Sequence, residues 1–290
     1  MRRLVGFVFF GAMAFAVGAE DAPRPFASFD LAGPSNLNDP HDLAFGPDGK
    51  LYVADKFGSR IVVLDPETLE IERIVADGLL PGVHDVSFGP DGRAAVAVTA
   101  LNAVIVFDRL DVAEPTPQLS LAAPRTEGAL MHSNGRVYAT ASALGAVLAY
   151  EGYEIAATAV GHPGAHDIAE DKDGNVWVAD NFNRQLVKYT PDLTRLQSLN
   201  HAKFGFVGVR YMDFDDFGRM VVADQDGHRL LLIDPDGPDG GSLLGVLGTG
   251  LPGKGPGLFD DPEGIAVHEG RYFISDSDNN RIVRYAIVIN

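Results

Sequence analysis

The sequence HDLAFGPDG at residues 41–49 returns as HDVSFGPDG at residues 84–92 and as HDIAEDKDG at residues 166–174. A phrase that recurs at a period of about 40 residues is typical of solenoids and propellers. Each copy begins with a histidine, so a repeated fold would carry a side chain able to bind a metal at the same position of several repeat units. The repeat therefore indicates both the fold class and the candidate site.

Short strands are expected after each copy of the phrase. Leu51–Asp55 and Arg60–Leu64 have period-two patterning and are separated by a turn. Alignment on the glycine before each second strand finds six units, and their head residues are spaced 43, 43, 39, 44 and 53 residues apart. Three or more short strands per unit with Gly-Asp-Pro turns favour an all-β, six-bladed propeller over a helical repeat. The heads are His41, His84, Glu127, His166, Arg210 and Glu263.

The last unit lacks a fourth strand of its own. The chain ends shortly after residues 281–285, which form the third strand of that unit. Residues 25–31 are free to supply the fourth, which would close the ring and protect an open sheet edge. We therefore predict that an N-terminal strand completes the last blade.

The first 19 residues are typical of a secretory signal. Arg2 and Arg3 precede an apolar run over residues 4–17, and small residues follow up to Ala19. The run is shorter than the roughly 20 residues of a spanning helix. We expect residues 1–19 to be removed, which leaves residues 20–290 as a single propeller domain. The chain has no cysteine, hence no disulfide or thiolate site, and we expect a monomeric bacterial protein that is periplasmic or secreted.

The charge of the chain is strongly acidic. Loss of the signal removes two arginines, so the formal charge moves from −17 to −19. Such a surface should repel nucleic acid and anionic lipid, and we expect neither as a partner. Such a charge favours cationic partners or metal ions over anionic ones, although simple solubility is the more ordinary explanation.

Aspartate and arginine pairs five residues apart recur at the turn between the second and third strands. With the glycine-rich link at residues 248–267, these pairs resemble the NHL-repeat family over essentially all of the mature chain. The resemblance implies a six-bladed propeller and leaves function open, because propellers host enzymes and binding scaffolds alike. We interpret the pairs as structural bridges across the turn. They are Asp55 with Arg60, Asp224 with Arg229, and Asp276 with Arg281.

The six heads should form a ring at one mouth of the central channel, because each precedes the innermost strand of its blade. Imidazoles and carboxylates that converge there would suit zinc above all, with iron or calcium as alternatives. Alternate blades select His84, His166 and Glu263, and His41 is then a fourth ligand or a general base. The competing interpretation is that each His-Asp pair only caps its strand.

Other ionisable residues are expected to act differently. Strand alternation directs Asp42, Asp85 and Asp167 away from the histidines that precede them, from where they could orient a neighbouring imidazole. The remaining histidines share no register and are expected at the surface or in loops. They are His132, His162, His201, His228 and His268.

The PHDL phrase at residues 40–43 is similar to the head motif of the peptidyl-hydroxyglycine amidating lyases. That resemblance implies zinc held by three channel histidines, here His41, His84 and His166, and cleavage of a carbinolamide into an amidated peptide and glyoxylate. Arg210 and Tyr211 would then bind a substrate carboxylate and assist proton transfer. Two features depart from that family: these histidines come from blades one, two and four instead of alternate blades, and the chain has no disulfide.

Two functions are therefore expected from the sequence. In the first, a metal at the channel mouth polarises a carbonyl or hydroxyl group and activates water, so the protein is a lyase or hydrolase for a small organic or peptide-derived substrate. In the second, the propeller is a scaffold that binds a protein, a cell-wall fragment or a small ligand without turning it over.

Overall fold

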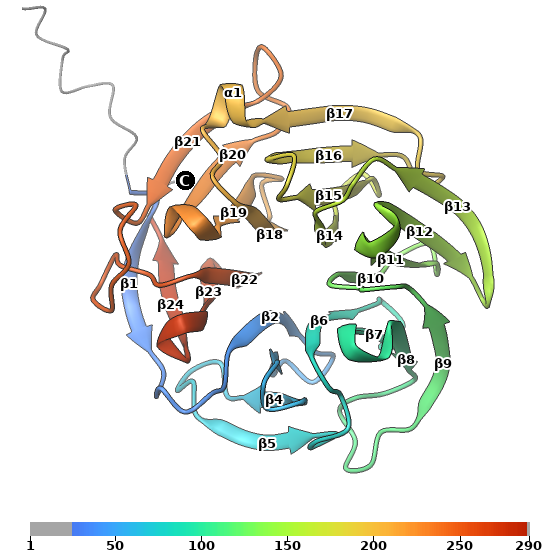
Figure 1. Cartoon of the computed structure of the whole chain (residues 1–290). Helices are drawn as coiled ribbons and strands as arrows, with labels where there is room; N and C mark the ends of the chain where they lie inside the picture. Colours follow the sequence, from blue (N-terminus) through green and yellow to red (C-terminus); the bar gives the residue numbers. More distant parts are fainter. Residues whose placement is uncertain (1–24, 289–290) are drawn as a thin grey trace, which may run out of the picture.

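The computed structural model describes residues 25–288, and the predicted signal lies outside this range. Within it, twenty-four strands form six antiparallel sheets of four strands, arranged as the blades of a propeller (Figure 1). No helix in this part of the chain is both long enough and apolar enough to cross a membrane. The all-β, six-bladed fold predicted from the repeat is confirmed.

The strands of the first three blades run from the axis to the rim in chain order. Blade one holds β2 (Pro40–Phe45), β3 (Leu51–Asp55), β4 (Arg60–Leu64) and β5 (Ile71–Val75); blade two holds β6 (Val83–Phe88), β7 (Ala94–Val98), β8 (Ala103–Phe107) and β9 (Pro117–Ala122); blade three holds β10 (Ala129–Met131), β11 (Val137–Ala141), β12 (Ala146–Glu151) and β13 (Glu154–Val160).

Blades four and five follow the same order. Blade four holds β14 (Ala165–Glu170), β15 (Val176–Asp180), β16 (Gln185–Tyr189) and β17 (Arg195–Asn200), and is followed by the short helix α1 (His201–Phe204); blade five holds β18 (Val209–Phe214), β19 (Met220–Asp224), β20 (Arg229–Asp234) and β21 (Ser242–Leu247).

The two ends of the described chain meet in blade six. It holds β22 (Pro262–His268), β23 (Arg271–Asp276), β24 (Arg281–Ile287) and, at the rim, β1 (Ala27–Ala32). β1 pairs antiparallel with β24, so the predicted closure by an N-terminal strand is confirmed. Every described blade is thereby a complete four-stranded sheet, and the ring is closed by backbone hydrogen bonds.

The core lies between the faces of adjacent blades. Tyr52 and Val63 of blade one, for example, pack with Val96 and Ile105 of blade two. Successive side chains of a strand point to opposite faces, and the second strands of blades one to five are buried along their whole length. Apolar side chains therefore cover both faces of each sheet, and every blade buries apolar surface against two neighbours. Burial of each large side chain stabilises the fold by about 1.5–3 kcal/mol. This packing holds the inner strands in fixed positions around the axis.

The aspartate and arginine pairs bridge turns on the face that carries the heads. Arg60 Nε donates to Asp55 Oδ2 at 2.8 Å, and Asp224 with Arg229 and Asp276 with Arg281 repeat the contact. The aspartates of these pairs are fully buried. A buried carboxylate needs both an ion pair and further hydrogen bonds, so the interpretation of the pairs as structural agrees with their contacts.

Blade four replaces the arginine with a histidine from the preceding link. His162 Nδ1 lies 2.9 Å from Asp180 Oδ2, and Gln185 occupies the arginine position. His162 and His132 lie in loops, as expected for histidines outside the shared register, but each is only 2% exposed. His162 is buried because an unpaired Asp180 would be costly in this interior, and its imidazole satisfies that carboxylate.

Candidate metal centre

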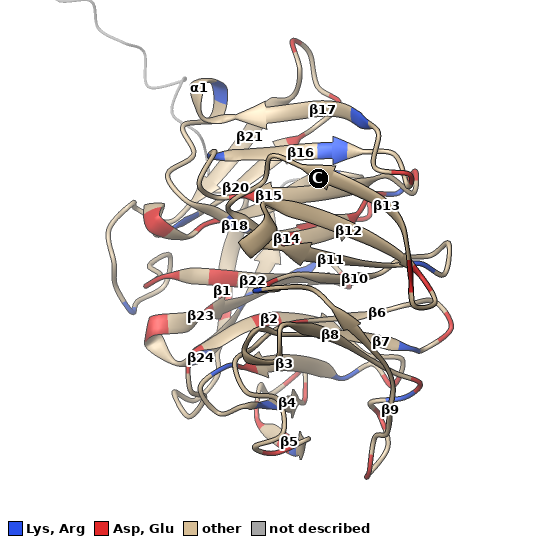
Figure 2. Ribbon diagram, turned by 45° about the vertical axis from the view of Figure 1, so that its right-hand side comes forward, with Lys and Arg blue, Asp and Glu red and all other residues tan. Residues whose placement is uncertain are grey.

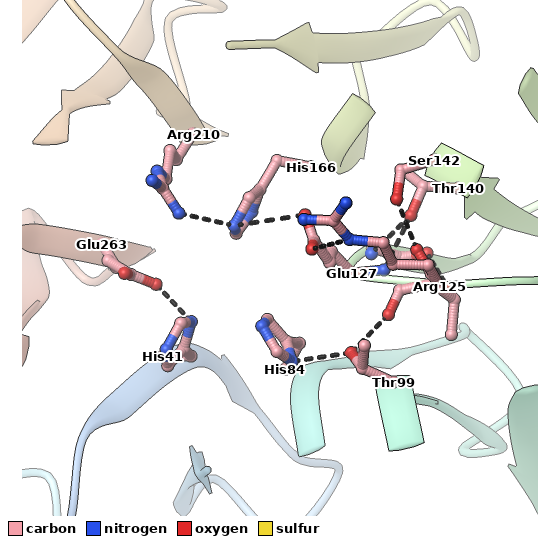
Figure 3. Close-up of polar contacts among 12 residues, drawn as sticks. His41, His84, Thr99, Arg125, Glu127, Thr140, Ser142, His166, Arg210 and Glu263 are labelled. Carbon is pink, nitrogen blue, oxygen red and sulfur yellow. Dashed lines mark hydrogen bonds and ion pairs between the residues drawn. The ribbon is translucent and has the colours of Figure 1, made fainter. Parts of the chain in front are cut away.

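The head residues lie at one end of the channel because the inner strands begin there. Figure 3 shows side chains of all six heads around the same opening. In five of the described blades, the pairing of the inner strand with its neighbour shifts register at the head. In blade one, Pro40 pairs with Asp55 and Leu43 with Val53, so β2 contains one extra residue. Such a bulge changes the direction of side chains next to it.

The bulge explains an expectation that is wrong. Simple alternation directs Asp42, Asp85 and Asp167 away from the histidines, from where they are expected to orient a neighbouring imidazole, but all three line the channel below the histidines. Each accepts a hydrogen bond from the next inner strand of the ring, as Asp85 Oδ2 does from the Ala129 N–H at 3.0 Å. Asp213 makes the same kind of contact with Val267. These carboxylates join neighbouring blades instead of orienting the imidazoles.

Three imidazoles come together at the mouth. His41, His84 and His166 are 1%, 7% and 2% exposed, and a ring nitrogen of each lies within 4.8 Å of one in each of the others. Their ring centroids are separated by 4.6 Å for His41 and His84, 6.0 Å for His84 and His166, and 6.4 Å for His41 and His166. A single ion could contact all three rings after small side-chain movements.

The His84 ring is held in one tautomer by its surroundings. Nδ1 lies 2.9 Å from the Gly82 carbonyl and 2.8 Å from Thr99 Oγ1. The Thr99 hydroxyl donates to the Thr126 carbonyl, so its oxygen accepts from His84. Nδ1 therefore carries the proton, and Nε2 keeps the lone pair that a metal requires. Metal-ligating histidines usually donate their second N–H in this way.

The His166 ring is less completely satisfied. Arg210 Nη1 lies 3.3 Å from Nε2, and Glu127 Oε2 lies 3.8 Å from the same atom. Nδ1 is buried and has no hydrogen-bond partner in the described residues. The Tyr211 ring packs edge-on against the imidazole at 4.8 Å between centroids. Arg210 can only donate, so Nε2 accepts and Nδ1 of the neutral ring carries the proton, which leaves a buried donor without an acceptor in the described part of the chain.

His41 has an acidic environment. Its Nδ1 contacts Glu263 Oε2, and its Nε2 lies 3.2 Å from Asp39 Oδ2 and 2.9 Å from Lys56 Nζ. Glu263 therefore lies against His41 and is not one of the three residues whose candidate ligand atoms lie within 4.8 Å of one another. Asp39 and Lys56 were not identified from the sequence, because only the folded turn between β3 and β4 brings Lys56 to the histidine.

The protonation states of the three rings differ. Burial lowers the pKa of His84 to about 3, and the neighbouring His41 and Lys56 reinforce this shift. Burial, together with Arg210 and the other histidines, also lowers the pKa of His166 well below its usual range. Burial alone would lower the pKa of His41, but Glu263 and Asp39 outweigh it and raise that pKa. Two neutral rings thus offer lone pairs, and a proton competes for the third.

Tyr211 and Arg210 occupy different environments at this mouth. The Tyr211 hydroxyl is buried and donates to the His84 carbonyl at 3.1 Å. Burial, with Glu263 and the channel aspartates, raises its pKa well above the usual value. Arg210 lines a hollow of about 70 Å³ with His166, Glu127 and Arg125. The geometry therefore suits Tyr211 for positioning the His84 strand and Arg210 for contact with a bound molecule.

Comparisons with known proteins agree with the repeat pattern. The family profile described as Domain of unknown function (DUF5074) matches residues 33–202, and the NHL repeat profile matches residues 259–285. No curated protein matches the sequence.

Similar solved structures have the same type of fold. Virginiamycin B lyase from Staphylococcus aureus is 11% identical with a TM-score of 0.64, and the match covers 88% of this chain and 98% of that one. The PQQ-bound aldose sugar dehydrogenase from Streptomyces coelicolor is 12% identical with a TM-score of 0.63, covering 92% and 100%. An auxiliary nutrient binding protein from Bacteroides ovatus is 17% identical with a TM-score of 0.67, covering 89% and 72%. The TM-scores establish a shared propeller fold, and sequence identities this low leave function open.

Proposed function

The chain belongs to the DUF5074 family and is an NHL-type propeller, and we propose that it holds a divalent metal ion, zinc, on His41, His84 and His166 at the channel mouth. The observation that carries the proposal is the convergence of three buried imidazoles whose ring nitrogens lie within 4.8 Å of one another. Neutral nitrogen ligands favour zinc or iron over calcium, which prefers oxygen. Glu263 keeps a supporting role through its contact with His41.

The proposed chemistry is that of a lyase or hydrolase. A divalent ion held by three protein ligands polarises a carbonyl oxygen and lowers the pKa of water. Arg210 is placed beside His166 to bind an anionic group such as a carboxylate, because its guanidinium borders the same hollow. A negative group between Arg210 and the ion would offset the repulsion between these two positive charges.

Glu127 is a second group suited to the reaction. Burial raises the pKa of its carboxyl, although Arg125 and Arg210 oppose the shift. A carboxyl with a raised pKa near the mouth is suited to accept and return a proton during the reaction. We therefore assign Glu127 to proton transfer, Arg210 to substrate binding and Tyr211 to positioning. Export to the periplasm or beyond remains part of the proposal.

Metal content of the purified mature protein tests the proposal directly. The measurement is plasma mass spectrometry of wild type, His84→Ala and His166→Ala after mild chelation and reloading with zinc. We expect about one zinc per wild-type chain and none in either variant. His268→Ala is the matched control, because that ring stacks on Phe45 at the far end of β22. Absence of retained zinc in wild type would overturn the metal site and favour the scaffold function.

Activity is tested on the loaded protein. Ester, amide and carbinolamide substrates with and without a free carboxylate are compared by product mass. We expect turnover of the carboxylate-bearing members, with Arg210→Lys raising KM more than it lowers kcat. Zinc binding without turnover of any substrate class would leave a metal-dependent binding protein.

A further inference from the structure

Exposed apolar side chains surround one half of the histidine mouth. In blades one to four, the turn between the second and third strands presents one large apolar residue to solvent. Single exposed residues of this kind are ordinary, but here the same turn repeats one in four consecutive blades, and we call the set the apolar arc. Its members are Phe57, Leu101, Leu144 and Phe182, which are 66%, 50%, 61% and 64% exposed.

The turns of the apolar arc also contact the candidate site. Lys56, next to Phe57, lies 2.9 Å from His41, and Thr99 in the second turn lies 2.8 Å from His84. Phe182 itself lines the hollow that His166 and Arg210 share. In Figure 3, Thr99 lies beside His84, and Ser142 lies on the outer side of Glu127. A molecule bound at the histidines would therefore extend onto the arc without leaving this face.

The other half of the same mouth is acidic. The equivalent turns of blades five and six carry Asp226 and Asp278, both exposed, and the link before β22 adds Asp260 and Asp261. We call these four residues the acidic arc, and Figure 2 shows acidic segments in red beside β22 and β23. His228 Nδ1 lies 3.6 Å from Asp260 and 3.9 Å from Asp261.

We infer that the mouth face binds a short peptide that carries large apolar side chains toward blades one to four and a positive charge toward blades five and six. Burial of apolar side chains on the arc favours binding, and the acidic arc attracts the positive charge of the peptide, while Arg210 beside His166 takes a carboxylate of the same molecule. The inference rests on the proposed function, because a metal held by the three histidines would set where the reacting group of the peptide lies. It adds the class of substrate that the face selects.

Four labelled hexapeptides test the selectivity. They are cationic and apolar (lysine, leucine, phenylalanine), anionic and apolar (glutamate in place of lysine), cationic and polar (serine in place of the apolar residues), and neutral and apolar. Their Kd values for zinc-loaded protein are measured by fluorescence anisotropy. We expect the cationic apolar peptide to bind at least about tenfold more tightly than each of the others. Equal affinities for the four peptides would overturn the inference.

Variants assign the binding to the two arcs. Phe57→Ser with Phe182→Ser should weaken the cationic apolar peptide about tenfold, and Asp226→Asn with Asp278→Asn should remove the preference over the anionic peptide. Phe217→Ser is the matched control, because Phe217 is also 66% exposed but lies in the turn between β18 and β19 on the opposite face. Unchanged affinity in the first two double variants would contradict the assignment.

Zinc content of the same samples separates the two proposals. A protein that retains zinc but binds all peptides equally refutes the substrate class and leaves the metal site intact. A protein that selects the cationic apolar peptide but retains no zinc refutes the metal site and leaves the binding face.

Discussion

Asp213 gives the most direct test of the electrostatics of the channel. Its carboxylate lines a cavity of about 290 Å³ in the half of the channel away from the histidines. It accepts hydrogen bonds from the N–H groups of Val267 and Phe214, each at 2.7 Å. Burial nevertheless raises the pKa of Asp213 from 3.8 to about 7, and the neighbouring Asp215 adds to the shift. The folded state therefore binds this proton more tightly than the unfolded state.

The sign and size of the effect on stability follow from that shift. Below about pH 4 Asp213 is protonated in both states, and above about pH 7 it is ionised in both, so the folded state loses stability as the pH rises between these values. A difference of about three pKa units corresponds to about 4 kcal/mol. The side chain is only partly buried, so we discount this value for solvent screening to about 2 kcal/mol.

The perturbation is Asp213→Asn, which keeps the size of the side chain and removes its titration. Loss of one accepted hydrogen bond costs about 1 kcal/mol at every pH. Urea unfolding of chelator-treated protein gives the free energy of unfolding at about pH 4.5, 6 and 7.5. We expect the difference between variant and wild type to change by about 2 kcal/mol in favour of the variant as the pH rises. Asp216→Asn makes the same chemical change on an exposed side chain and is the control; a pH-independent difference for Asp213→Asn would refute the reasoning.

Three further predictions concern the mouth and its supports. Glu263→Gln removes the carboxylate that raises the pKa of His41, so the pH midpoint of zinc release should fall; a uniform loss of zinc at every pH would instead make Glu263 a ligand. Gly128→Ala places a Cβ 2.2 Å from the His166 carbonyl oxygen, and we expect it to lower the free energy of unfolding by about 2 kcal/mol or more in urea and to reduce zinc retention. Asp224→Ala leaves Arg229 and the N–H groups of Val207 and Gly208 without their buried acceptor, which should cost about 3–5 kcal/mol in urea unfolding, whereas Asp216→Ala should cost less than about 0.5 kcal/mol.

The fold was predictable because its determinants are local and repeated. Period-two strands joined by short turns, at a period near 40 residues, specify one blade after another. The Asp55 and Arg60 pair spans a single turn, so its contact follows from spacing alone. The closure by β1 was also predictable, because the last blade lacked a strand and a sheet edge without a partner is unfavourable.

The sequence predicted the site only as a set of head residues at one end of the central channel. The sequence indicated His41, His84 and His166 as repeats of one position, but their separation across the axis depends on the closure of the whole ring. Register shifts at the heads bring Asp42 and its counterparts into the channel beside them, which alternation alone does not predict. Lys56 and the buried His162 were likewise placed by neighbouring elements.

The sequence by itself determined the strand order within a blade, the number of blades and the residues that head them. Each of these depends on short-range patterns of apolar and polar residues, which decide directly which side chains are buried. Only the tertiary structure decided which heads approach one another and which protonation states they adopt. Those properties depend on distances between residues 43 to 125 positions apart and on burial, and both are fixed when the six sheets pack around a common axis.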